Sequence, residues 1–159
     1  MPQREDFSRR RSPPDLIRAL GRLARDDSES LASSVLPLLA HAEPDVRSEA
    51  LSAVFVLWRL DEHREQAKRM LEADRHAEVR ARAAYAIAAT SNEQTRRTDA
   101  LLLLNKIESP NEDAEVRRAA YEALMLLFGR GDLPDAVKDF VPEEQIDWAW
   151  LSELRSMLA

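Results

Sequence analysis

A short motif, an acidic residue followed by Val-Arg, recurs along this chain and constrains its fold more than any other feature. It occurs three times, 33 and then 37 residues apart, at Asp45-Val46-Arg47, Glu78-Val79-Arg80 and Glu115-Val116-Arg117. The residue four positions after each Val is Ala, and the residue eight positions after it is aliphatic, which is the spacing of one helix face. Self-similarity with a period of roughly 20–50 residues is the signature of stacked structural repeats. We therefore predict a repeat array, which presents a surface for holding another protein rather than a cleft for chemistry.

Composition agrees with a helical array. The chain has 159 residues, of which 45% are hydrophobic and 33% charged, and only three are Gly, too few for a turn-rich β protein. Cysteine is absent, which excludes a disulfide framework, a thiolate metal site and a Cys nucleophile. The first residues lack the apolar run of a signal peptide, and no apolar stretch is long enough to span a bilayer. We therefore expect a cytoplasmic protein without membrane association.

Apolar periodicity and turn residues divide the chain into helical segments. We predict a basic, disordered tail at residues 1–13 and one domain at residues 14–159, with an opening helix at 14–26, helix pairs at about 28–60, 61–92 and 93–129, and an acidic C-terminal cap at 132–159. Pro37 should bend the first helix of the first pair. Gly129 should terminate the last pair, and Pro142 stands at a natural first helical position of the cap. The apolar stripe of the cap is Ile146, Trp150, Leu154 and Leu158.

The arginine of the motif needs a partner outside its own turn. A carboxylate at a helix N-terminus is stabilised by the helix dipole, but an arginine in the same turn is not. Its recurrence at Arg47, Arg80 and Arg117 predicts that a carboxylate from a neighbouring turn binds each guanidinium.

At these residues the chain resembles HEAT repeats, particularly the short bacterial, phycobilisome-lyase-type HEAT-like proteins. The resemblance covers roughly residues 28–129, and the Leu-Pro-Leu-Leu run at 36–39 also looks like a first helix of that family. It departs in the short, polar first helix of the second pair and in extra residues of the third. It implies an all-α, right-handed α-α superhelix, or solenoid, of about three antiparallel helix pairs with N- and C-terminal capping helices. It also implies a ladder between repeats, formed by Asp45, Arg47, Glu78, Arg80, Glu115 and Arg117.

A helical wheel started at each repeated Val separates the core face from the exposed face. The positions four, eight and eleven residues after the Val should face the core, and the position six residues after it should face away. In HEAT-like stacks the second helices line the concave surface, which is the usual groove for a partner. The predicted partner-binding residues on this strip are Arg59, Arg82, Tyr85, Arg118 and Glu122. Arg82 and Tyr85 lie at its centre, and Arg and Tyr are common at binding hot spots.

Trp148 falls off the apolar stripe of its own segment. It either folds back on Phe140 and Val141 or forms an exposed aromatic anchor for a partner.

Catalytic and metal-binding patterns are missing from the sequence. His41, His63 and His76 are isolated, and none has a second ligand at a metal-binding spacing. There is no Gly-rich phosphate loop and no Gly-x-Ser-x-Gly nucleophile elbow. We therefore assign no catalytic, metal-binding or cofactor-binding residue.

The function predicted from these features is non-catalytic binding of another protein, as an adaptor, scaffold or inhibitor-like module. The net charge of −6 argues against nucleic-acid binding, which needs clustered basic residues. Two alternatives come from the resemblance alone: a lyase-like or chaperone-like subunit for a tetrapyrrole chromophore, and a relative of HEAT-like DNA-repair glycosylases. The sequence specifies neither the identity of the partner nor an oligomeric state.

Overall fold

The computed structural model describes residues 13–23, 32–130 and 145–159, and within these ranges it is helical without strands. The elements in chain order are α1 (Pro13–Leu23), α2 (Ala32–Val35), η2 (Leu36–Ala40), α3 (Pro44–Leu51), η3 (Ser52–Leu57), η4 (Asp61–His63), α4 (Arg64–Ala73), α5 (Ala77–Ala89), α6 (Arg96–Glu108), α7 (Ala114–Leu127) and α8 (Trp148–Leu158). None of the described helices has the length and apolar character needed to cross a membrane.

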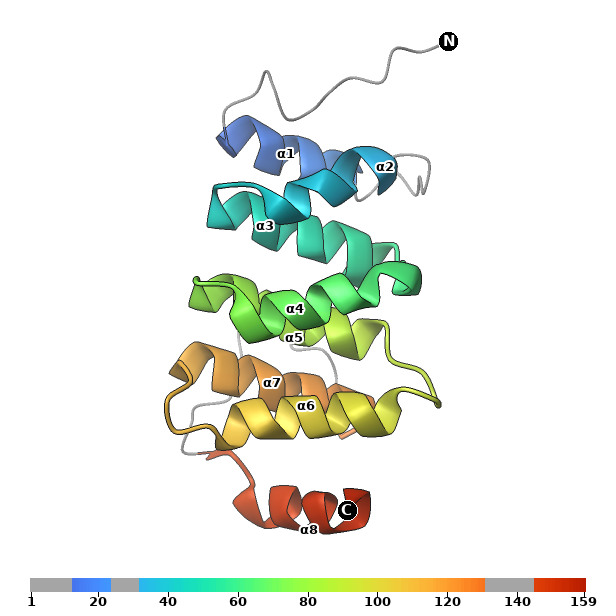
Figure 1. The fold of residues 1–159 in the computed structure, drawn as a ribbon, viewed down its shortest axis with the longest axis vertical. Helices are drawn as coiled ribbons and strands as arrows, with labels where there is room; N and C mark the ends of the chain where they lie inside the picture. The colour runs from blue at the N-terminus through green and yellow to red at the C-terminus, as the bar shows by residue number, and fades with distance from the viewer. Residues whose placement is uncertain (1–12, 24–31, 131–144) are drawn as a thin grey trace.

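The helices stack along the long axis of the molecule (Figure 1). One layer is continuous, because α1 packs on α3, α3 on α5 and α5 on α7. We call α3 with η3, α5 and α7 the second helices. The first helices, namely α2 with η2, α4 and α6, form the other layer, in which η2 packs on α3, α4 on α5 and α6 on α7. The last helix, α8, packs against α6 at the C-terminal end of the stack (Figure 1).

The residues that recur with the motif build the core between these layers. Val46, Val79 and Val116 are each 0% exposed. The Ala four residues later and the aliphatic residue eight residues later are also buried in every pair: Ala50, Ala83, Ala120, Val54, Ile87 and Leu124. Burying an aliphatic side chain of this size contributes about 1.5–3 kcal/mol. The repeated pattern therefore encodes equivalent core positions in all three helix pairs.

The first helix pair departs from regular α-helix in both of its helices. The α-helix α2 gives way at Leu36 to the 3₁₀ helix η2, which has proline in its first turn, so the distortion predicted at Pro37 is present. In the second helix, α3 passes into the π-helical segment η3, and the amide of Trp58 donates to the carbonyl of Ala53 at 3.0 Å.

The helical wheel predicted that the position eleven residues after the Val faces the core. This is wrong for Leu57 in the first pair, whose side chain is 56% exposed. A π turn takes in one more residue than an α turn and rotates every later side chain around the helix. Trp58, one residue further on, packs against the core instead.

The helix end predicted at Gly129 is present, whereas the C-terminal helix begins later than predicted. The helix α7 ends at Leu127, and Gly129 has a φ of 63°, a left-handed conformation that glycine adopts at low cost. The predicted helix start at Pro142 lies outside the described residues, but α8 begins only at Trp148. Its N-cap is Asp147, whose side chain accepts a hydrogen bond from the amide of Trp150 at 2.9 Å. Ile146 is therefore buried ahead of the helix rather than within it.

Candidate functional site

Arg47 links the first helix pair to the second. Its Nε and Nη2 donate to the two carboxylate oxygens of Asp74, each at 2.8 Å, in a forked arrangement. Its Nη1 donates to the carbonyls of His41 and Ala42 at 2.8 and 2.9 Å, and the residue is buried. Burial alone would raise the pKa of the Asp74 carboxyl, but the hydrogen bonds from Arg47 and the amide of His76 hold that pKa below its ordinary value.

Arg80 makes the corresponding link from the second pair to the third. Its Nε and Nη2 donate to Oε1 of Glu112 at 3.1 and 2.7 Å, and its Nη1 donates to the carbonyl of Asp74 at 2.8 Å. Lys106 Nζ lies 2.9 Å from the other oxygen of Glu112. Burial raises the pKa of Glu112, and the hydrogen bonds from Lys106, Arg80 and the amide of Asp113 outweigh it, so the net shift is downward.

The structure places the acids of the predicted ladder differently from the arginines. Asp45, Glu78 and Glu115 are exposed at the starts of the second helices. The carboxylates that bind Arg47 and Arg80 belong to Asp74 and Glu112, which lie in the turns five and four residues ahead of the next repeated Val. A side chain at a helix start points back toward the N-terminus of its own helix, where the charge of the motif acid is favourable. The turn acid lies ahead of the helix and reaches the preceding pair. The acidic turn residue ahead of each motif is the signal that could have found them.

Arg117, in the third motif, donates from Nε to the carbonyl of Ile107 at 3.0 Å. Like Arg47 and Arg80, it thus satisfies a carbonyl near the end of the preceding helix.

Four of the predicted partner-binding residues come together where α5 lies on α7. The Tyr85 hydroxyl donates a short hydrogen bond to Oε2 of Glu122. Burial, followed by this hydrogen bond and the charge of Glu122, raises the pKa of Tyr85, and the positive charges of Arg118 and Arg82 oppose the shift only in part. Arg82 precedes Tyr85 by about one helical turn on α5, and Arg118 precedes Glu122 by about one turn on α7. We call Arg82, Tyr85, Arg118 and Glu122 the α5–α7 cluster.

Exposure within this cluster differs from the wheel prediction. Arg82 is exposed, and Tyr85 and Arg118 are half-buried. Glu122, which the wheel placed on the exposed strip, is only 3% exposed. A wheel considers one helix at a time, whereas the Glu122 side chain is directed at the tyrosine of the neighbouring helix. Glu122 is therefore a buried support for Tyr85 rather than a surface contact.

Arg59 and Trp148 lie at helix ends. Arg59 follows η3, is exposed and has a φ of 52°. Trp148 is the first residue of α8 and is 47% exposed, while Phe140 and Val141, its proposed internal contacts, lie outside the described residues. The neighbouring Trp150 makes edge contacts with Tyr121 and Phe128, with ring centroids 5.9 and 6.4 Å apart.

A buried polar cluster between α4 and α6 was not predicted from the sequence. Asp99 is 0% exposed, and its Oδ2 accepts from Arg64 Nη2 at 2.6 Å and from Ser91 Oγ at 2.8 Å. Lys68 Nζ lies 3.9 Å from the other carboxylate oxygen. The signal for this cluster was an acid one helical turn before the core residue Leu103, on the apolar face of its own helix.

The histidines occupy turns and helix starts. His41 Nδ1 accepts from the amide of Glu43 at 3.1 Å, and His76 Nε2 lies 3.1 Å from Arg75 Nε. Within residues 13–23, 32–130 and 145–159, no group of three or more His, Asp or Glu side chains is arranged to hold a metal ion.

No protein-family model, curated protein or solved structure matches this chain. Its function must therefore be inferred from the geometry of its own residues.

Proposed function

We propose that this protein is a non-catalytic protein-binding module that holds another protein on the face of its second helices. The observation that carries the proposal is the α5–α7 cluster. The Tyr85 hydroxyl donates to the buried Glu122, which holds the ring in place one helical turn after the exposed Arg82. An aromatic residue that is ordered before binding loses little conformational entropy when a partner covers it.

The contrast with the motif arginines supports this assignment. Arg47 and Arg80 use their guanidinium groups inside the stack, on carboxylates and carbonyls of neighbouring turns. Arg82 lies two residues after Arg80 but is exposed. Arg47 and Arg80 therefore stabilise the fold, whereas the side chain of Arg82 is open to a partner.

We further propose that the stack is a short, right-handed HEAT-like solenoid with the second helices on its concave side. The second helices pack directly on one another, whereas a cleft separates η2 from α4 in the first-helix layer. A stack with one close and one open layer should curve toward the close layer. Stacked repeats commonly use such an extended concave surface for binding.

Affinity capture with matched variants tests the proposal. The full chain, immobilised, should capture a specific protein from its native source, and Arg82→Glu combined with Tyr85→Ala should abolish that capture. The control is Arg96→Glu, which makes the same charge change at an exposed arginine at the start of the first helix α6. Far-UV circular dichroism of each variant shows whether the fold is retained.

Equal capture by the folded double variant and the wild type would contradict the binding face. A visible absorbance change on titration with a linear tetrapyrrole, with no protein captured, would instead favour a chromophore-handling subunit.

A further inference from the structure

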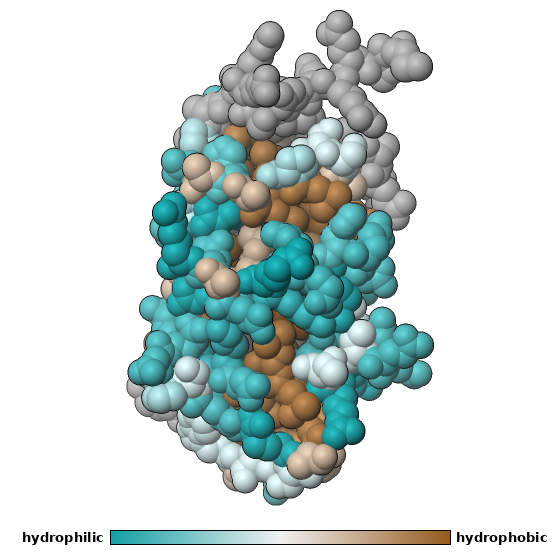
Figure 2. Space-filling model, in the orientation of Figure 1, coloured by the Kyte–Doolittle hydropathy of each residue, from teal (hydrophilic) through white to brown (hydrophobic). Residues whose placement is uncertain are grey.

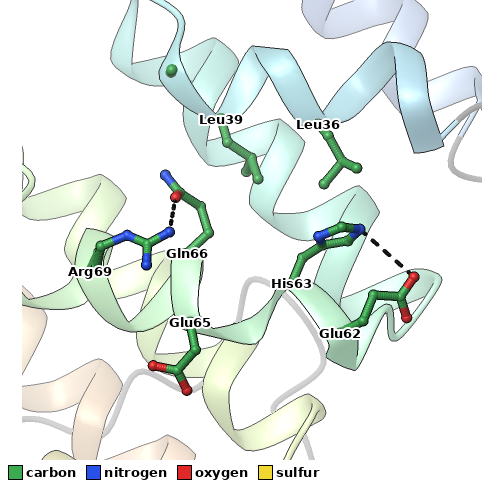
Figure 3. A pocket seen from close by; sticks show the side chains of 8 residues that line it. Leu36, Leu39, Glu62, His63, Glu65, Gln66 and Arg69 are labelled. Carbon is green, nitrogen blue, oxygen red and sulfur yellow. Dashed lines mark hydrogen bonds and ion pairs between the residues drawn. The ribbon is translucent and has the colours of Figure 1, made fainter.

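An open cleft of about 380 Å³ lies in the first-helix layer, between η2 and α4 (Figure 3). It is lined by Leu36, Leu39, Ala40, Glu62, His63, Glu65, Gln66 and Arg69. Its size falls within the range of roughly 300–1,000 Å³ that is typical of small-molecule sites. The cleft belongs to the other layer from the α5–α7 cluster, so its occupant is independent of the proposed protein partner.

The wall contributed by η2 is apolar. Leu36 and Leu39 point from the 3₁₀ helix toward α4 (Figure 3). Leu36 is half-buried, and Leu39 is buried, with 4% of its surface exposed. On the same face of the molecule, Figure 2 shows apolar surface at the level of α2 and η2, bordered by hydrophilic residues. Leu36 is therefore the leucine of this wall that is more open to a ligand.

The wall contributed by η4 and α4 is polar, with hydrogen-bond donors at one end. His63, Gln66 and Arg69 are spaced three residues apart and therefore share one face of this segment. Arg69 Nη2 donates to Gln66 Oε1 at 2.6 Å. This contact uses one of the five N–H donors of the guanidinium and leaves both donors of the Gln66 amide. The Gln66–Arg69 end therefore offers a positive charge and several donors beside apolar carbon.

The two acidic residues of the lining are engaged away from that end. Glu65 lies 2.9 Å from Lys68 Nζ, and its side chain points away from the leucine wall (Figure 3). The hydrogen bond from Lys68, together with the positive charges of Lys68, Arg64 and Arg69, lowers the pKa of Glu65 and favours its charged form. Glu62 Oε1 lies 3.7 Å from His63 Nε2, at the opposite end of the cleft from Arg69.

We infer that this cleft binds a small apolar carboxylate, with its hydrocarbon part on Leu36 and Leu39 and its carboxylate on the Arg69 guanidinium and the Gln66 amide. The guanidinium fork matches the geometry of a carboxylate and can bind it through two parallel hydrogen bonds. The leucines bury the hydrocarbon part, which a free anion such as acetate lacks.

Titration of the isotope-labelled full chain with octanoate, followed by proton–nitrogen correlation spectra, tests the inference. Octanoate should shift the amide signals of residues 36–40 and 63–69. Arg69→Gln should weaken binding about tenfold or more, because it removes the charge-assisted hydrogen bonds. Leu36→Gln, at a half-buried position, should weaken it to a similar degree by making the wall polar. Octanol and octylamine test the need for the negative charge, and both should bind at least about tenfold more weakly than octanoate.

Arg96→Gln is the matched control, since it removes an exposed arginine from α6 without touching the cleft, and it should leave octanoate affinity unchanged. Four results would overturn the inference: no binding below the micelle concentration of octanoate, signal shifts confined to other segments, unchanged affinity in Arg69→Gln, or equal affinity for octylamine. An acetylated Leu-Glu-Leu tripeptide that binds at least about tenfold more tightly than octanoate would also overturn it, because the cleft would then be a peptide site.

Discussion

Two helix ends of this protein adopt the same left-handed backbone conformation with different residues. Gly129 follows α7 with a φ of 63°, and Arg59 follows η3 with a φ of 52°. The amide of Leu60 then closes the η3 end on the carbonyl of Val54 at 3.0 Å, much as the amide of Arg130 closes the α7 end on Met125 at 2.9 Å. For a residue with a Cβ this conformation costs about 1–2 kcal/mol. Arg59 therefore sits under strain that Gly129 avoids.

Arg59→Gly is expected to raise the free energy of unfolding by about 0.5–1 kcal/mol, since relief of strain exceeds the extra chain entropy of glycine. Gly129→Ala is the opposite experiment and should lower it by about 1 kcal/mol. An added Cβ at position 129 meets nothing within 4 Å, so this loss measures backbone strain and not a clash. Urea unfolding followed by circular dichroism measures both changes. A less stable Arg59→Gly would mean that the Arg59 side chain makes contacts worth more than its strain.

Ion pairs of two kinds join neighbouring elements, and they differ in what surrounds them. Arg47 and Arg80 reach from second helices to the turn acids of the next pair, and each guanidinium also donates to a carbonyl in the turn ahead of its own helix. Arg64 and Asp99 join two first helices through a carboxylate with no exposed surface. Removing one partner of a buried pair leaves the other charge unpaired in a medium that solvates it poorly.

Asp99→Ala is therefore expected to lower the free energy of unfolding by about 3–5 kcal/mol, because Arg64 and Lys68 lose their buried counter-charge. Replacing both partners, as Arg64→Met with Asp99→Leu, should recover most of this loss, since apolar groups of similar volume need no pairing. The two variants are compared by urea unfolding. A loss below about 1 kcal/mol in Asp99→Ala would show that the carboxylate contributes little to the link between α4 and α6.

The turn acids Asp74 and Glu112 make the stability of the protein depend on pH in the acid range. The pKa values of Asp74 and Glu112 lie below their ordinary values of 3.8 and 4.5 in the folded protein, so the unfolded chain binds protons first as the pH falls. The stabilisation is complete above those ordinary values and is lost as the pH falls through the depressed folded pKa values. Arg47→Gln and Arg80→Gln should each make stability fall less steeply as the pH is lowered. The measurement is the urea unfolding midpoint at a series of pH values below about 5. Arg96→Gln should keep the wild-type profile, and an unchanged profile in the two ladder variants would contradict this account.

At the scale of the whole molecule, the repeated positions could be predicted from the sequence and the exceptions could not. The motif Val, the Ala four residues later and the aliphatic residue eight residues later depend only on helix period, so a wheel finds them. Leu57 was misplaced because the π turn changes that period within the helix. The burial of Glu122 and of Asp99 was not predicted, because each makes its contact with another helix, Tyr85 on α5 and Arg64 on α4 respectively. The spacing of apolar residues within one helix does not predict which side chains of another helix it will contact.

The C-terminal helix closes the stack, and its removal should change the behaviour of the whole molecule. Leu151 and Leu154 of α8 are each 1% exposed, and Arg155 bridges to Glu108 and Asn105 of α6. The terminal unit of a repeat array must cover the apolar face of its neighbour to remain soluble. Leu151→Asp with Leu154→Asp places two charges in that interface, which should release α8 because a buried unpaired charge is strongly unfavourable.

The released face of α6 should then associate with a second copy of the chain, so light scattering coupled to size-exclusion chromatography should report a mass that rises with concentration. Ser152→Asp with Glu153→Gln is the matched control, because both positions lie on the exposed side of the same helix and the wild-type mass should persist. A double-aspartate variant that keeps the wild-type mass and melting temperature would mean that α8 does not cover an apolar end. The stack would then be closed by α6 and α7 themselves.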